Sequence, residues 1–121
     1  MKGKTIVLGA SPNPERYSHV AANMLQGGSF DFELYGRKKG TVAGKEIITE
    51  VPDKIADVDT FTMYLGAKNQ EEFYPLILNS KPRRIIFNPG AENAELAGLA
   101  ALQGIEVVEA CTLVMIRTGQ Y

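Results

Sequence analysis

Short apolar runs alternate along this chain with segments whose apolar residues recur at helical spacing. Helices are predicted at residues 18–26, 69–80 and 94–103. The first ends at Gly27-Gly28, the last ends at Gly104, and Asn69 with Glu72 matches a capping box. Residues 36–44 are polar and are expected to form a loop. Five to six strands are expected, from apolar runs at 5–8, 31–35, 58–64, 83–87 and 105–108 and weaker patterns at 45–49 and 112–116.

Alternating strands and helices predict a mainly parallel, doubly wound sheet with helices on both faces, a three-layer Rossmann-like α/β fold. At 121 residues the chain is expected to be a single domain, residues 1–121. The main strands should have the order 3-2-1-4-5. A doubly wound fold consists of two βαβαβ halves. In the first half of this chain, a loop and a short turn at 51–55 replace the second helix.

Composition narrows the function classes. The net charge is -1, which does not indicate a nucleic-acid-binding protein. The apolar runs are far shorter than the ~20 residues of a membrane span, and no signal-peptide pattern precedes the first strand. The one cysteine, Cys111, fits a reducing compartment, so we expect a cytoplasmic protein.

The segment after the first strand holds the best candidate ligand site. It contains one glycine of the three in a dinucleotide fingerprint, yet a strand-to-helix turn offers free amides and a helix dipole to phosphate. Hydroxyl, amide and guanidinium groups add donors. The alternative is a proline-stiffened turn that binds nothing. The candidate residues are Gly9, Ala10, Ser11, Asn13, Arg16, Tyr17 and Ser18.

The end of the second strand narrows the choice of ligand. NAD-binding folds place an acidic residue there, whereas this chain has Arg37, Lys38 and Lys39. These cations would suit a phosphate on a ribose, which both NADP and coenzyme A carry. A solvated basic loop is the alternative.

Several motifs together resemble one family. The run from Gly9 to Ser18 is similar to a G-A-S-x-[ND]-P-x-[RK]-x-S turn, and Lys39-Gly40 is followed by a second glycine, Gly44. The segment 89–93 and the closing segment at Cys111 also fit. The chain therefore resembles the small CoA-binding domain proteins of bacteria, which are related to the CoA-binding domain of the succinyl-CoA synthetase α subunit.

This resemblance implies a Rossmann-like fold that places the Gly9 turn on the phosphates of coenzyme A. It also implies that Lys39, with Lys38 beside it, contacts the adenosine end, and that Tyr64, Asn88, Pro89 and Gly90 flank the nucleotide and pantetheine. The chain departs from the family pattern before Lys39, where the family often has Asn-Pro, and after the fourth strand, where a basic pair is common.

No set of residues indicates catalysis or a metal site. His19 has no acidic or nucleophilic partner in a recognisable motif, and Cys111 lacks other soft ligands. We therefore expect non-catalytic binding of coenzyme A or an acyl-CoA. One alternative is an NADP-binding small reductase or redox-sensing domain with Tyr17 or Tyr64 as proton donor. Another is a ligand-free interaction domain that forms a homodimer or binds an unidentified protein through a sheet edge.

Overall fold

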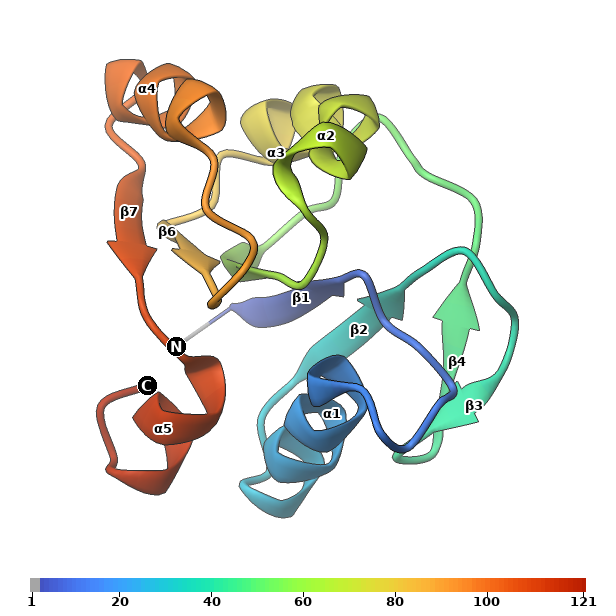
Figure 1. Ribbon diagram of the computed structural model, residues 1–121. Helices are drawn as coiled ribbons and strands as arrows, with labels where there is room; N and C mark the ends of the chain where they lie inside the picture. The colour runs from blue at the N-terminus through green and yellow to red at the C-terminus, as the bar shows by residue number, and fades with distance from the viewer. Residues whose placement is uncertain (1–2) are drawn as a thin grey trace.

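The computed structural model describes residues 3–121 as three layers with a seven-stranded sheet in the middle (Figure 1). The strands are β1 (Lys4–Leu8), β2 (Phe32–Tyr35), β3 (Thr41–Val42), β4 (Lys45–Ile48), β5 (Val58–Met63), β6 (Arg84–Phe87) and β7 (Glu106–Glu109). One face is covered by α1 (Tyr17–Gly27) and α5 (Thr112–Arg117). The other is covered by α2 (Ala67–Gln70), the 3₁₀ turn η1 (Glu71–Phe73), α3 (Tyr74–Ser80) and α4 (Ala94–Leu102). This is the expected Rossmann-like fold, although the sheet has seven strands and the prediction of five to six is wrong.

The strand order is β3-β4-β2-β1-β5-β6-β7, and every pair except β3 with β4 is parallel. The predicted order of the main strands is therefore confirmed. The chain begins in the middle of the sheet at β1 and builds outward, first through β2 and then through β5. The reversal of direction beside β1 is the topological switch point of a doubly wound sheet, and ligands bind such folds beyond the carboxyl ends of the strands there.

Both faces of β1 are buried because helices lie above and below it. Ile6 and Leu8 belong to the cluster under α3 and α4, whereas Val7 belongs to the cluster under α1. All three side chains are fully buried. This continuous apolar run is typical of a parallel strand with no solvent-facing side. It holds the turn that follows Leu8 on a rigid base.

Two predicted elements are wrong. Residues 36–44 are not all loop, because β3 forms a hairpin with β4 around Ala43 and Gly44, which have φ values of 53° and 77°. Positive φ at both turn positions is what a two-residue hairpin requires. Residues 112–116 form helix α5 rather than a strand. Leu113 is buried and Ile116 packs beside α1, a three-residue spacing that outweighs the β-branched composition.

The predicted capping box is also wrong. The helical segment begins at Ala67, with Gly66 as its N-cap, and Asn69 caps nothing. Its side-chain oxygen instead accepts a hydrogen bond from Arg37 (3.3 Å). The absence of a helix between β4 and β5 agrees with the sequence, since residues 49–57 form turns and irregular chain.

Candidate functional site

The Gly9 turn (residues 9–16) leaves β1 at the switch point and is fastened to the end of β2. The amides of Gly9 and Ala10 both donate to the carbonyl of Tyr35, at 2.9 Å each. Gly9 has φ +97°, and a Cβ there would lie 3.0 Å from both the Leu65 side chain and the Tyr64 backbone. Glycine is therefore required, because the turn passes close to the end of β5 in a left-handed conformation.

The start of α1 leaves backbone donors available. Arg16 is the N-cap residue, and no side chain caps this helix. The amides of Tyr17 and Ser18 donate to no other residue in the described part of the chain. Such amides, together with the helix dipole, make a favourable place for phosphate oxygens. Arg16 itself is exposed and forms no ion pair within residues 3–121, so its guanidinium adds an available charge.

Two of the predicted donors stabilise the turn itself. The Ser11 hydroxyl accepts from the Asn13 amide (3.1 Å), and the Asn13 side chain accepts from the Glu15 amide (3.0 Å). The Ser18 side chain is buried and Tyr17 is exposed. The Ser11 hydroxyl proton and the Asn13 side-chain nitrogen remain as donors. The main contribution of both residues is to fix the backbone of the turn that leads into α1.

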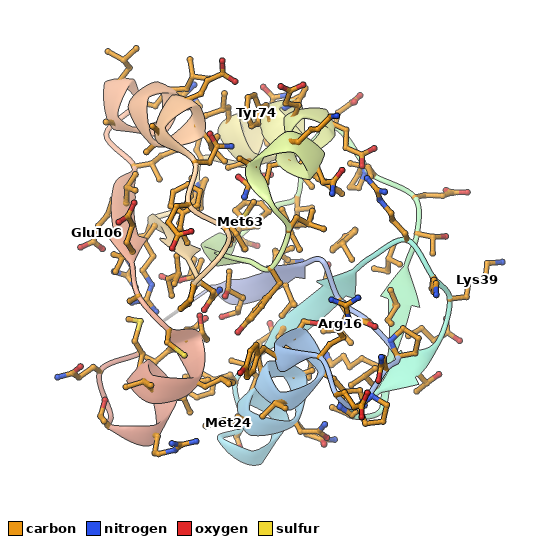
Figure 2. The ribbon with its side chains drawn as sticks, in the orientation of Figure 1. Arg16, Met24, Lys39, Met63, Tyr74 and Glu106 are labelled. Atoms are coloured by element: carbon orange, nitrogen blue, oxygen red, sulfur yellow. The ribbon has the colours of Figure 1, made fainter. Side chains whose placement is uncertain are left out.

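The loop after β2 packs directly on the Gly9 turn. A Cβ at Gly36 would lie 2.2 Å from the Ala10 carbonyl oxygen, and one at Gly40 would lie 2.8 Å from Pro12. These two glycines allow the loops to touch, and they bring the cations at 37–39 to the same edge of the sheet as the Gly9 turn. Lys39, however, points away from Arg16 into solvent (Figure 2).

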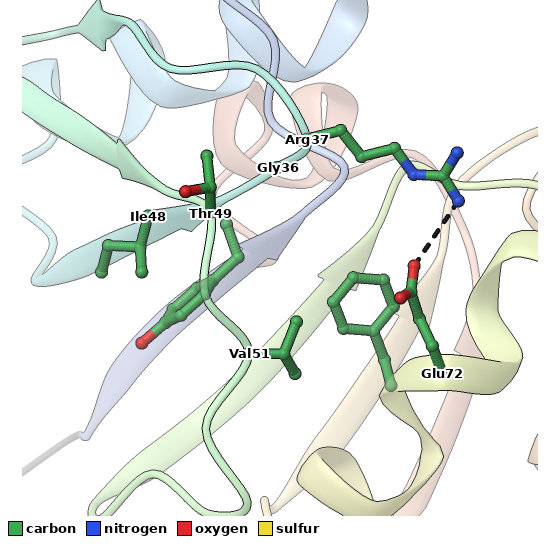
Figure 3. A pocket seen from close by; sticks show the side chains of 8 residues that line it. Gly36, Arg37, Ile48, Thr49, Val51 and Glu72 are labelled. Atoms are coloured by element: carbon green, nitrogen blue, oxygen red, sulfur yellow. Dashed lines mark hydrogen bonds and ion pairs between the residues drawn. The ribbon is translucent and has the colours of Figure 1, made fainter.

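Arg37 has a more defined position than the lysines. Its guanidinium donates to Asn69 (3.3 Å) and pairs with Glu72 (3.5 Å), so it spans from the end of β2 to α2 and η1. Below it lies a cavity of about 190 Å³ lined by Tyr35, Ile48, Val51 and Phe73, among others (Figure 3). This cavity has apolar walls and a charged, exposed pair at its mouth. The sequence marks Arg37 as basic but gives no sign of its pairing with Glu72.

A buried amide network connects the loops after β5 and β6. The Gln70 side chain donates to the carbonyls of Leu65 and Ala91, at 2.7 Å each, and Asn93 donates to the Gln70 oxygen (2.9 Å). Gln70 is fully buried. Because it holds both loops, Gln70 positions this side of the site. The sequence does not indicate this role, since an isolated glutamine in a helix carries no distinguishing signal.

The side chain of Asn88, another predicted binding residue, forms hydrogen bonds within the protein. Its side-chain nitrogen donates to Thr62 (2.7 Å) and to the Met63 carbonyl (2.9 Å), and its oxygen accepts from the Thr112 amide (2.8 Å). The side chain thus joins β6, β5 and the start of α5. The exposed Pro89 and Gly90 follow it at the carboxyl edge, where Gly90 has φ +90°.

Tyr64 lies at the end of β5 with its hydroxyl pointing into the protein. That hydroxyl is buried and has no hydrogen-bond partner among the described residues. Burial raises the pKa of Tyr64 to about 12, and the nearby Thr62 and Thr112 hydroxyls, which bond to each other (2.7 Å), act in the opposite direction. A proton donor must lie within hydrogen-bond reach of its substrate, and a phenol whose hydroxyl is enclosed in the protein does not.

Comparison with known proteins decides the family. A model described as a CoA binding domain matches residues 3–117. The chain belongs to the CoA-binding domain family. An uncharacterised protein of known structure is 47% identical, with a TM-score of 0.94 over 100% of this chain and 99% of that one. A search of curated proteins found no match.

More distant structures share the fold of this CoA-binding domain. A hypothetical protein from Pyrococcus horikoshii OT3 has a TM-score of 0.81 at 21% identity, covering 97% of this chain and 83% of that one. A Thermus thermophilus protein, cell-free ID.343, has a TM-score of 0.82 at 20% identity, covering 98% and 91%.

The described residues, 3–121, contain neither a helix fit to span a membrane nor a cluster of metal ligands. No helix there has the length and apolar character needed to cross a membrane. No group of three or more His, Cys, Asp or Glu side chains within residues 3–121 could hold a metal ion.

Proposed function

We propose that this chain binds coenzyme A or an acyl-CoA without transforming it. The observation that carries the proposal is the uncapped start of α1 beside Gly9 at the switch point, within a CoA-binding domain that matches 3–117. The Tyr17 and Ser18 amides and the exposed Arg16 would hold the pyrophosphate.

The apolar cavity beside the end of β2 suits the adenine of the same ligand. Rossmann-type folds place the nucleoside beyond the second strand, and here Ile48, Val51 and Phe73 offer apolar contact. Arg37 at the mouth, with Lys38 and Lys39 in the same loop, would contact the ribose phosphate. Arg37 would exchange the Glu72 carboxylate for a phosphate oxygen, because the planar guanidinium fits either group through the same pair of N–H donors.

Titration calorimetry with coenzyme A, dephospho-CoA and NADPH tests the proposal. We expect coenzyme A to bind most tightly and the loss of the 3′-phosphate to weaken binding. Arg16→Ala should weaken coenzyme A binding by about 10- to 100-fold, the range of a charge-assisted hydrogen bond. Lys54→Ala, which removes an exposed cation from the loop before β5 at the other end of the sheet, is the matched control.

Two results would contradict the proposal. One is the absence of heat with coenzyme A at concentrations on the order of 1 mM, where even weak specific binding is measurable. The other is tighter binding of NADPH than of coenzyme A, which would favour the NADP-binding alternative. An equal loss of affinity in Arg16→Ala and Lys54→Ala would remove Arg16 from the site.

A further inference from the structure

A second cavity lies at the amino edge of the sheet, at the opposite end from the Gly9 turn. Its volume is about 450 Å³. Small-molecule sites commonly fall within ~300–1,000 Å³. Its walls come from the starts of β1, β5 and β6, the turn after α1 and the C-terminal residue. Nothing in the proposed binding of coenzyme A uses this space.

Arg84 lines this cavity and is an unusual residue for its place. It is the first residue of β6, a strand buried at every position, and only 5% of its surface is exposed. Its Nε donates to the Thr60 hydroxyl (2.8 Å), and its guanidinium carbon lies 4.5 Å from the centre of the Tyr121 ring. No carboxylate of residues 3–121 forms an ion pair with it.

The neighbouring acid, Asp59, lies near enough for its charge to favour that of Arg84, but it forms no direct ion pair with Arg84 because Arg83 holds it. The Asp59 carboxylate accepts two hydrogen bonds from Arg83, at 2.8 Å and 3.1 Å, and a third from the Thr60 hydroxyl (2.7 Å). A buried cation without a counter-ion is costly. Arg84 lines the cavity, and its terminal nitrogens make no hydrogen bond to a side chain or carbonyl of residues 3–121, so the guanidinium can offer them to a carboxylate in a bidentate manner.

The remaining wall is aromatic. Phe30 and Tyr121 meet edge to face, with ring centres 5.1 Å apart, and the Tyr121 hydroxyl contacts the Thr5 hydroxyl. We propose that this cavity is a second ligand site, which binds a small carboxylate on a flat apolar body. Its carboxylate would lie on Arg84 and its body against Phe30. Asp31 and Asp59 line the same space, so a single negative charge is favoured over the double charge of a phosphate.

Benzoate is the probe for this site, with benzyl alcohol and inorganic phosphate as comparisons. In ¹H–¹⁵N NMR spectra, benzoate should shift the amides of Ser29 and Phe30 with a Kd on the order of 1 mM or below. Benzyl alcohol and phosphate should shift them much less. Binding of phosphate but not benzoate, or no shift with benzoate at concentrations on the order of 10 mM, would overturn the proposal.

Variants assign the site to Arg84. Arg84→Gln should weaken benzoate binding at least about tenfold. Arg117→Gln, which removes an exposed arginine of α5, should leave it unchanged. Ser29→Asp adds a negative charge at the rim without altering the buried strand, and Asp tolerates the φ of 59° found there. It should also weaken binding several-fold. Unchanged affinity in a folded Arg84→Gln or in Ser29→Asp would contradict the proposal.

Discussion

At the scale of single residues, Gly9 shows how one backbone conformation shapes the site. Its φ of +97° directs the chain across the end of β5, and two amides of the turn bond to Tyr35. A side chain at this position would be strained by the left-handed φ and would press on Leu65 and Tyr64. The position of the Gly9 turn therefore depends on the absence of a Cβ atom at Gly9.

Gly9→Ala should lower the free energy of unfolding by about 1–3 kcal/mol, because alanine is disfavoured at positive φ and must displace its neighbours. Gly98→Ala is the matched control. Gly98 lies inside α4 with open space around its Cβ position, so alanine should stabilise the protein by about 0.5–1 kcal/mol. Urea denaturation measures both, and equal effects of the two substitutions would contradict this account of Gly9.

Tyr64 gives a prediction about pH. Burial raises the pKa of Tyr64 to about 12, so between pH 10 and 12 the unfolded chain loses this proton while the folded chain keeps it. The stability contributed by the neutral phenol is thus present below pH 10 and is lost as the pH rises toward 12. Tyr64→Phe should remove about 1–2 kcal/mol of this alkaline loss.

At pH 7 the same substitution should leave the free energy of unfolding unchanged or raise it by up to about 1 kcal/mol, because the buried hydroxyl has no partner to lose. Urea denaturation at pH 7 and pH 11 measures both effects. Tyr17→Phe changes a phenol that is 73% exposed and serves as the control. A marked loss of stability at pH 7 in Tyr64→Phe would show that the hydroxyl is hydrogen-bonded after all.

At the scale of elements, the Asn88 side chain at the end of β6 joins that strand to β5 and α5. Its three side-chain hydrogen bonds are all buried. Asn88→Ala should destabilise the protein by about 2–4 kcal/mol, since it removes the side-chain hydrogen bonds to the buried Thr112 amide and to the Met63 carbonyl. Asn79→Ala removes one exposed contact to the Asp53 carbonyl and should change stability by less than about 0.5 kcal/mol. Thermal denaturation would distinguish the two variants. A loss of stability below about 1 kcal/mol in Asn88→Ala would contradict this role of Asn88.

The elements that sequence predicted well are those with a strong apolar period. Apolar runs identify β1, β5 and β6, and helical spacing identifies α1 and α4. Their alternation along the chain leads to the strand order and the switch point. Segment 112–116 was misassigned because its β-branched residues favour a strand, whereas packing against α1 and the bond from Asn88 select a helix. The β3–β4 hairpin was missed because Ala43-Gly44 is a weak turn signal.

The candidate site was predicted only in part, for the same physical reason. A turn with a glycine and an arginine after the first strand can be located from local chemistry. The pairing of Arg37 with Glu72 and the role of Gln70 depend on segments 35 and 21 residues apart in the chain. Contacts of this kind follow from the packed fold and leave no local pattern.

At the scale of the whole molecule, the C-terminal residue closes the amino edge of the sheet. Tyr121 contacts Thr5, Phe30 and Arg84, which come from β1, from the chain before β2 and from β6. The last residue of the chain thus connects segments that the sheet alone leaves separate at this edge.

Tyr121→Ala should lower the free energy of unfolding by about 2–4 kcal/mol, through loss of ring contacts and of the cation–π contact with Arg84. Gln120→Ala removes an exposed neighbouring side chain and should have an effect below about 0.5 kcal/mol. Guanidinium chloride denaturation provides the comparison. Equal stability of the two variants would mean that the tail is not docked in solution.

The central position of β1 has a consequence for synthesis. β1 leaves the ribosome well before its partner β5, which begins only at Val58. During that interval Ile6, Val7 and Leu8 form an apolar strand with an unpaired edge, which is a template for association with other chains. Changes in residues 36–57 that delay the arrival of β5 should therefore lower the yield of folded protein in the cell, even when the purified protein is as stable as before.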